Sequence, residues 1–354
     1  SSRESKGEAS GHFYAVGTAG SILGAFGTTY LLIPNLAVNQ IYLIFALMAL
    51  APTIGGLKDL ALPTAVALGG VLAVSTPGIA ADAVYSEETS YQSLKVERSG
   101  DKTTLYLDGT PQSSKYLESN RSPWEYPKYF HLGFLMREDV GDALFIGGGG
   151  FVSPQQFASQ GVDVDAVELD PGVVDASRRY FNLSEGKNLD VHVEDGREFL
   201  EDSESTYDLV VLDAFRKNTV PFHLTTEEFF ELVHRKTDEN GVVISNLIST
   251  SSGPGSGLAR SYHRTISEVF ETTYYVPTSN TSFVQNVEII ASKNQRLSKK
   301  ELRARNSEYS KRNLSGEIGM IRKIDSSDSQ VLTDDYAPVD RLMSPLVGRR
   351  YVVN

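Results

Sequence analysis

Residues 144–170 read LFIGGGGFVSPQQFASQGVDVDAVELD, two short apolar runs separated by a glycine-rich turn. The first run, residues 144–146, leads directly into the glycines at 147–150, and the second run ends at Glu168. A strand that enters consecutive glycines lets the backbone turn sharply and approach a ligand. A carboxylate about 20 residues later falls at the tip of the next strand, where ribose hydroxyls are held. The stretch therefore predicts a nucleoside-binding site in an α/β fold.

Two further strands are predicted downstream, and each closes on an acidic residue. Residues 190–193 lead to Asp195, and residues 207–212 lead to Asp213. In an open parallel sheet the carboxyl ends of the strands line the ligand crevice, so we expect these acids to converge there with Glu168. The alternative is that the glycines form only a tight turn and the acids are solvated strand ends.

Composition narrows the classes of function. With 354 residues, of which 40% are hydrophobic, the chain can form one large domain with accessories, which excludes a disordered chain. The absence of cysteine excludes disulfides, thiolate nucleophiles and cysteine-ligated metal centres. The six histidines lack metal-ligand spacing, so no metal is expected. A net charge of −12 disfavours nucleic acid and suits a small cationic ligand, although a merely soluble acidic surface explains it equally well.

The first 81 residues have a different composition. Three blocks, residues 12–34, 36–56 and 60–80, are almost free of charged residues. Each is close to the ~20 residues that cross ~30 Å of hydrocarbon as a helix. Residues 1–81 are therefore predicted to form a transmembrane region of two or three spans, which makes the chain an integral membrane protein in contact with lipid.

The side of the membrane on which the soluble domain lies stays open. Positive charge near the apolar blocks is confined to Arg3, Lys6 and Lys58, which by the positive-inside rule puts the domain outside after three spans. A nucleotide-dependent enzyme instead needs the cytoplasm. The chain opens with Ser1 and no methionine, which suggests processing or a piece of a longer membrane protein.

The remainder is predicted to form three parts. Residues 82–132 form a small β domain and connector, in which residues 91–98 and 103–109 alternate around a glycine turn as a hairpin. Residues 133–293 form the Rossmann-like nucleoside-binding domain, and residues 294–354 form a helical and acidic tail. Further helices are predicted at residues 225–236 and 256–270, and further strands at residues 241–248 and 282–291.

Several short motifs occur in an order typical of one enzyme family. They are Ile-Gly-Gly-Gly (146–149), Val-Glu-Leu-Asp (167–170), Glu-Asp-Gly-Arg-Glu-Phe-Leu (194–200), Tyr-Asp-Leu-Val-Val-Leu-Asp (207–213) and Thr-Thr-Glu-Glu-Phe-Phe (225–230). With the preceding hairpin, this set resembles the spermidine synthases, or polyamine aminopropyltransferases, over residues 85–291. The chain looks closest to a membrane-fused branch of that family, whose further motifs are matched here by residues 20–24, 213–215, 221–224 and 333–338.

The resemblance implies a methyltransferase-type Rossmann fold with a seven-stranded sheet, preceded by a small β-hairpin domain and N-terminal transmembrane helices. It implies decarboxylated S-adenosylmethionine as the donor, a small cationic amine as the acceptor, and no metal. Carried over by position, the donor site consists of Gln92, Gly147, Gly148, Gly149, Glu168, Asp195 and Gly196. In it, Glu168 holds the ribose hydroxyls and Asp195 holds the adenine amino group.

The resemblance also suggests where the acceptor amine binds and reacts. Tyr126 falls where a tyrosine lines the acceptor site, and Asp213 is a candidate catalytic acid. Asp334 and Asp335 are expected to fold back over the crevice, Asp334 to bind substrate and Asp335 to act in catalysis; the alternative is a capped turn that docks the tail. His223 is a candidate general base, because histidine is the side chain that most often transfers protons near neutral pH, or else a residue that orients a loop.

The chain departs from the family pattern at three places. Gly150 stands where the family has an aspartate that grips the donor's amine. Asp213 is followed by residues 214–217, Ala-Phe-Arg-Lys, where the family continues to a second aspartate. Residues 126–128 are Tyr-Pro-Lys where the family has Tyr-His-Glu.

Three functions remain open on these grounds. The first is an aminopropyltransferase-like enzyme. The second is a methyltransferase that uses intact S-adenosylmethionine, with Arg216 and Lys217 as partners for the donor's carboxylate. The third is a noncatalytic module that binds a polyamine or assembles in the membrane, and a homo-oligomer is compatible with each.

Overall fold

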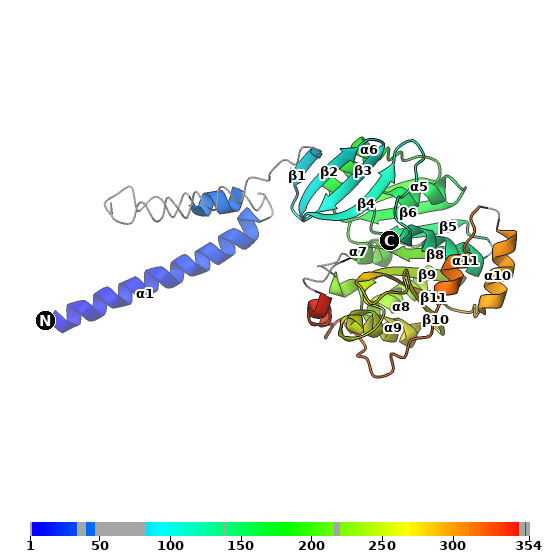
Figure 1. Ribbon diagram of the computed structural model, residues 1–354. Helices are drawn as coiled ribbons and strands as arrows, with labels where there is room; N and C mark the ends of the chain where they lie inside the picture. The colour runs from blue at the N-terminus through cyan, green and yellow to red at the C-terminus, as the bar shows by residue number, and fades with distance from the viewer. Residues whose placement is uncertain are drawn as a thin grey trace. The chain divides into compact units, whose positions relative to one another are not determined.

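The computed structural model describes residues 2–33, 40–46, 83–137, 139–215, 220–309, 311–346 and 351. The chain divides into two compact units, Ser1–Lys95 and Val96–Asn354 (Figure 1). The four-part division expected from composition stays a prediction.

The first unit begins with a long helix. Helix α1 spans Ser2–Gly27 and continues into the π-helical segment η1, Thr28–Leu32. Residues Tyr14–Leu32 have a mean hydropathy of 1.2 and no burial, so this stretch is long and apolar enough to cross a membrane. It is the one such helix in the described residues, and a signal sequence near an N-terminus would meet the same criterion of length and hydropathy. The predicted block 36–56 is described only at residues 40–46, which are helical, and the block 60–80 lies outside the described residues.

A small sheet follows, with strand order β1-β2-β3-β4. Its strands are β1 Ala83–Glu88, β2 Ser93–Ser99, β3 Lys102–Leu107 and β4 Thr110–Tyr116. The predicted hairpin corresponds to β2 and β3. β4 pairs antiparallel with β3 through a turn at Asp108 and Gly109, which both have positive φ, 48° and 71°. This strand was not predicted, because the sequence Thr-Pro-Gln-Ser-Ser-Lys-Tyr lacks apolar alternation.

The second unit is built on the predicted seven-stranded sheet, in the order β10-β11-β9-β8-β5-β6-β7 (Figure 1). The strands are β5 Asp142–Ile146, β6 Asp163–Glu168, β7 Leu189–Val193, β8 Tyr207–Leu212, β9 Thr237–Ser249, β10 Thr272–Pro277 and β11 Gln285–Ser292. β5 to β9 run parallel, whereas β11 is antiparallel to β9 and β10 is antiparallel to β11.

Helices cover both faces of this sheet, because successive residues of a strand point to opposite sides. Ile146 and Leu212 belong to one hydrophobic core, whereas their neighbours Phe145 and Val211 belong to the other. The first core is completed by α7 Gly196–Asp202, α8 Glu227–Lys236, α9 Gly257–Val269 and α12 Val339–Met343. The second is completed by η2 Tyr126–His131, α4 Leu132–Met136, α5 Val152–Ala158, α6 Pro171–Tyr180, α10 Lys299–Glu308 and α11 Ser315–Met320.

Short 3-10 turns complete the described elements. They are η3 Phe222–Leu224, η4 Pro254–Ser256 and η5 Ser344–Leu346. The parallel strands β5, β6, β7 and β8 end at the same edge of the sheet, where the helices that follow them begin. That edge carries the candidate site.

Candidate functional site

The glycine turn after β5 brings two strand ends into direct contact. Gly147 has φ +100°, and a Cβ there would lie 2.5 Å from the backbone oxygen of Asp213. The amide of Asp213 donates to the carbonyl of Ile146 at 2.8 Å. Only glycine permits this approach, because a side chain would collide with the backbone that follows β8. The turn therefore holds the Asp213 backbone beside the loop.

Gly150 is enclosed. A Cβ at this position would lie 2.7 Å from the ring of Phe181 and 2.8 Å from the hydroxyl of Ser113. An aspartate could not enter without displacing both neighbours. Phe181 and Ser113 therefore fill the space that an aspartate side chain at this position would need.

Glu168, at the end of β6, is bound to the glycine turn itself. Its Oε2 accepts from the amides of Gly148 at 2.9 Å and Gly149 at 3.2 Å, and its Oε1 accepts from the amide of Asp170 at 3.0 Å. Burial raises the pKa of Glu168, and these amide hydrogen bonds oppose the rise. A carboxylate offers about four acceptor positions, of which three are used here. The predicted contact with ribose hydroxyls stays a prediction, and the structure adds a role in stabilising the turn.

Asp195 caps the helix that follows β7. Its Oδ1 accepts from the amides of Arg197 at 2.8 Å and Glu198 at 3.3 Å, and its Oδ2 lies 3.0 Å from Nε2 of His223. The hydrogen bond from His223, followed by the amides, lowers the pKa of Asp195. Gly196 allows the helix to begin against the sheet, since a Cβ there would lie 2.4 Å from Ile146. Asp195 is therefore held as an ionised acceptor.

The tail segment that contains Asp334 docks on this same helix. Arg197 forms a bidentate pair with Asp334, at 2.8 and 2.7 Å, and also donates to the carbonyl of His223 at 3.2 Å. Thr226 donates to Asp334 at 2.7 Å. Arg197 is the largest cause of a lowered pKa for Asp334. The tail segment thus docks on α7 through the ion pair of Asp334, and the predicted substrate-binding role of Asp334 stays a prediction.

Asp335 occupies the exposed tip of that tail segment. The amides of Thr333 and Tyr336 bond each other's carbonyls across the turn, at 3.2 and 3.0 Å. The side chain of Asp335 is exposed. Its catalytic role stays a prediction.

Asp213 is a half-buried acid at this edge. Its Oδ1 accepts from Nδ2 of Asn246 at 2.6 Å, and its Oδ2 accepts from the hydroxyl of Tyr126 at 3.5 Å. Burial raises the pKa of Asp213 to about 7, against the lowering effect of these two hydrogen bonds. Asn286 donates to Asn246 at 2.9 Å, and Tyr351 donates to Asn286 at 2.9 Å. A chain of side chains from separate parts of the sequence therefore orients one carboxyl.

Glu288 lies opposite this group on the sheet and has no hydrogen-bond partner among the residues that the structure describes. It sits on β11 opposite Asn246 of β9, is completely buried, and neither carboxyl oxygen is hydrogen-bonded within the described residues. Burial, followed by the charge of Asp213, raises the pKa of Glu288 well above its ordinary value. Burial raises the pKa of Tyr126 and of Tyr351, and the charges of Asp213 and Glu288 add to both shifts.

The predicted site residues thus fall into separate groups. Glu168 binds the glycine turn, Asp195 joins His223 and Asp334 around Arg197, and Tyr126 joins Asp213. Gln92 belongs to the first unit, where its amide donates to Thr89 at 3.1 Å, and its donor role stays a prediction. Arg216 and Lys217 lie outside the described residues. No cluster of three or more potential metal ligands occurs in the described part of the chain.

Sequence reasoning missed Asn246, Asn286 and Glu288. All three interrupt the apolar strands β9 and β11, which read Thr-Asp-Glu-Asn-Gly-Val-Val-Ile-Ser-Asn-Leu-Ile-Ser and Gln-Asn-Val-Glu-Ile-Ile-Ala-Ser. A polar residue that interrupts a buried strand is costly unless it is bonded or used, and this was the available signal. Tyr351 gave no signal, because its contact with Asn286 spans 65 residues of sequence.

Comparison with known proteins identifies the domain. Residues 128–301 match the Spermine/spermidine synthase domain family. A "Probable polyamine aminopropyl transferase" from Bifidobacterium longum is 27% identical over 282 residues, which cover 73% of this chain and 61% of that protein. An "N-terminal histidine N-methyltransferase" from Emericella nidulans is 34% identical over 144 residues, which cover 39% of this chain and 25% of that protein. The chain therefore spans less than two thirds of the length of either relative.

A solved structure supports the fold. The crystal structure of a probable spermidine synthase from Corynebacterium glutamicum superposes with a TM-score of 0.57, at 20% identity, over 76% of this chain and 96% of that one. At this identity the likeness establishes the α/β fold with its small antiparallel sheet.

Proposed function

From the premise that residues 128–301 form a spermine/spermidine synthase domain, we propose that the chain transfers an aminopropyl group from decarboxylated S-adenosylmethionine to a small amine. The observation that carries the proposal is Asp213. It is a half-buried carboxyl at the ligand edge of the sheet, oriented by Asn246 and Tyr126, and desolvation raises its pKa to about 7. A base with a pKa near the working pH is suited to accept a proton from an amine.

The chemistry requires an unprotonated amine held in line with the donor. The amine nitrogen attacks the methylene carbon beside the sulfonium, a carbon–nitrogen bond forms, and the carbon–sulfur bond breaks. The electron pair of that bond goes to sulfur, which leaves as methylthioadenosine. The proton lost by the amine goes to Asp213. Sulfonium is already an activated leaving group, so most of the catalysis is positioning and proton transfer.

Glu288 is the candidate for the second acid of the acceptor site. The family's second aspartate is absent after Asp213, and Asp334 is bound by Arg197 at 2.7 Å. Glu288 is the buried carboxyl near Asp213 that has neither an ion pair nor a hydrogen bond among the described residues. An ammonium group brought between the two carboxyls would favour the ionised form of both. Glu288 would then bind the acceptor's ammonium while Asp213 acts as the base.

The donor would be held by the glycine turn and two acids. Glu168 keeps one acceptor position for a ribose hydroxyl, and Asp195 keeps an ionised carboxylate beside the turn. The enclosed Gly150 means that the donor's amine would have to be held by another group.

A methyltransferase is the second candidate, and the 34% identity to the histidine N-methyltransferase favours it. Intact S-adenosylmethionine carries a carboxylate that needs a positive partner, for which Arg216 and Lys217 are the candidates. Replacing both would then weaken binding of S-adenosylmethionine much more than binding of the decarboxylated donor. Equal effects on the two donors would count against this reading.

The test is isothermal titration of the full chain with methylthioadenosine, S-adenosylmethionine and the decarboxylated donor, followed by an acceptor screen that measures methylthioadenosine release. Aminopropyl transfer predicts a preference for the decarboxylated donor, lost in Glu168→Gln and kept in the matched control Asp190→Asn at an exposed strand position. A preference for intact donor, with S-adenosylhomocysteine as product, would favour the methyltransferase. If none of the three binds, the fold serves as a noncatalytic module.

We also propose that the chain is anchored to a membrane through the helix that contains Tyr14–Leu32. Alkaline carbonate extraction of membranes tests this anchoring. The full chain should stay with the lipid, and release of the chain into the supernatant would overturn it.

A further inference from the structure

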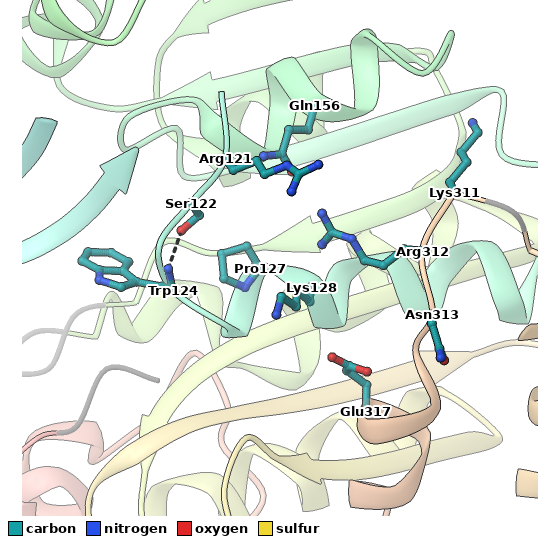
Figure 2. A pocket seen from close by; sticks show the side chains of 10 residues that line it. All are labelled: Arg121, Ser122, Trp124, Pro127, Lys128, Gln156, Lys311, Arg312, Asn313 and Glu317. Carbon is teal, nitrogen blue, oxygen red and sulfur yellow. Dashed lines mark hydrogen bonds between the residues drawn. The ribbon is translucent and has the colours of Figure 1, made fainter. Parts of the chain in front are cut away.

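The second unit contains a hollow of about 360 Å³ with unusual charge (Figure 2). Its wall, here called the basic hollow, includes Arg121, Trp124, Lys128, Lys311, Arg312 and Glu317. The chain as a whole has a net charge of −12, yet this wall contributes four cations against one carboxylate. A local excess of cations on an acidic protein indicates a place that attracts anions.

Two of these cations already have contacts. Lys128 forms an ion pair with Glu125. Lys311 lies 5.4 Å from the centre of the Phe134 ring and donates to the carbonyl of Gln160 at 3.4 Å. Their charges are thus partly satisfied within the protein.

Arg121 and Arg312 are different. No ion pair joins either guanidinium to a carboxylate within the described ranges of the chain. Figure 2 shows both guanidinium groups pointing into the same space. Both residues also line a second hollow of about 200 Å³, so each remains open to a ligand. Two like charges that face each other repel unless an anion lies between them.

We propose that the basic hollow binds a multivalent phosphate anion between Arg121 and Arg312. A guanidinium presents its donors in a planar fork that matches phosphate oxygens in a bidentate manner, and two forks suit a group with several phosphate oxygens. Lys128 and Lys311 add positive charge at the rim. Glu317 is the one carboxylate of the wall.

This site is independent of the proposed aminopropyl transfer. None of its wall residues belongs to the group around Asp213, Asp195 or Glu168. The acids of the candidate site suit a cation, whereas the basic hollow suits an anion, so the two ligands differ in chemistry. The phosphate could belong to a free metabolite or to a lipid headgroup, and the test separates these sources.

The first measurement is isothermal titration of the full chain with inorganic phosphate, pyrophosphate and tripolyphosphate at constant ionic strength. Affinity should rise with ligand charge. Arg121→Gln and Arg312→Gln should each weaken tripolyphosphate binding by about tenfold or more, and Arg121→Lys by less, because the fork is lost but the charge remains. Arg178→Gln is the control, since Arg178 is an exposed arginine already paired with Glu185. Its affinity should match wild type.

Trp124 supplies a second readout, because it is the single tryptophan of the chain and lines the hollow. Its fluorescence should change saturably with tripolyphosphate and should not change in the Arg121→Gln/Arg312→Gln double variant. Circular dichroism establishes that the double variant is folded. Absence of saturable heat and fluorescence change in the wild type, or equal affinity in the double variant, overturns the proposal.

Vesicles separate the two sources of phosphate. Cosedimentation with phosphatidic acid vesicles that depends on Arg121 and Arg312, and that tripolyphosphate displaces, identifies a lipid headgroup. Arginine-dependent binding of tripolyphosphate with no arginine-dependent effect on vesicles identifies a free anion.

Discussion

The candidate site and the basic hollow differ in the sign of their charged groups and in how far neighbouring residues bind those groups. At the site, Asp213, Asp195 and Glu168 are each held by neighbouring amides, by an imidazole or by a hydroxyl. In the hollow, Arg121 and Arg312 have no such ion-pair partners among the described residues. Groups that must act on a reacting atom work best when neighbours already orient them, whereas groups that attract an ion benefit from unsatisfied charge. The contrast therefore separates a region that positions groups on a reacting substrate from a region that attracts an anion.

The two regions share one element, the 3-10 helix η2. It contributes Tyr126 to the site and Lys128 to the hollow. Tyr126 is buried and touches Asp213, whereas Lys128 is 37% exposed in its side chain. One short segment therefore serves an acidic and a basic region, and variants can show how independent they are.

The largest effect is expected at Asp213. Asp213→Asn keeps the shape of the side chain but removes the base, so aminopropyl transfer should fall by about 10²–10⁴-fold. Methylthioadenosine release under saturating donor and acceptor measures this. Asp190→Asn, an exposed carboxylate on β7, should retain wild-type turnover. Full activity of Asp213→Asn would show that Asp213 is not the base. The contrast between oriented acids at the site and unpaired arginines in the hollow would then have no functional meaning.

The dependence on pH should follow the same residue. The pKa of Asp213 is raised from 3.8 to about 7, so the folded protein holds a proton that the unfolded chain has lost. Its contribution to stability is present near pH 4, declines as pH rises to about 7, and is then constant. Activity changes in the other direction and should rise as the base ionises through about pH 7.

Thermal unfolding of wild type and Asp213→Asn between pH 4 and pH 8 checks the sign. The variant cannot ionise at this position, so its stability relative to wild type should increase with pH. A constant difference across the range contradicts burial as the cause of the shift.

Restoring the family's aspartate at position 150 should harm the fold. A Cβ at Gly150 lies 2.7 Å from Phe181, so Gly150→Asp should lower the free energy of unfolding by about 1–3 kcal/mol through overpacking. Gly186→Asp is the control, because no atom lies within 4 Å of its added Cβ. Equal melting temperatures for the two variants would show that the space around Gly150 adapts.

Glu288→Gln should affect the acceptor more than the fold. Burial raises the pKa of Glu288 well above its ordinary value, and glutamine keeps the size and neutrality of the protonated side chain, so the melting temperature should change little. The variant cannot ionise beside an ammonium, and KM for the amine should rise by about tenfold at unchanged donor affinity. A fall in kcat without a change in KM would point to a role in the chemical step instead.

The smallest effects are expected when each region is tested with the other's ligand. Arg312→Gln should bind the donor with an affinity within about twofold of wild type. Asp213→Asn should likewise bind tripolyphosphate with an affinity within about twofold of wild type, because substitutions at sites with no shared partners have additive effects. Isothermal titration of both variants with both ligands completes the comparison. A larger effect of either substitution on the other region's ligand would indicate coupling through η2. By linkage, each ligand would then change the affinity for the other by the same factor.

The central sheet was largely predictable. Apolar runs that end in glycines or acids identified β5, β6, β7 and β8, because a parallel strand buried on both faces reads as a continuous apolar segment. The caps at Asp195 and Thr226 follow from residues that prefer helix N-termini. β10 was not predicted, although it supplies the edge of the sheet.

The candidate site was predicted only in outline. The positions of Glu168, Asp195 and Asp213 follow from the ends of their strands. Their partners do not, since Asp195 meets His223 from 28 residues away and Asp213 meets Tyr126 from 87 residues away.

The sequence by itself determined the strands β5 to β8, the glycine turn and the acids at the strand ends, because these depend on residues that are neighbours along the chain. Only the tertiary structure decided that Asp334 pairs with Arg197 and that Asp213 is bound by Asn246. It also decided that Glu288 is buried without a hydrogen-bond partner among the described residues. It alone brought Arg121 and Arg312 together across 191 positions of sequence. Charges act through space, and a linear pattern does not specify the distance between groups from different elements.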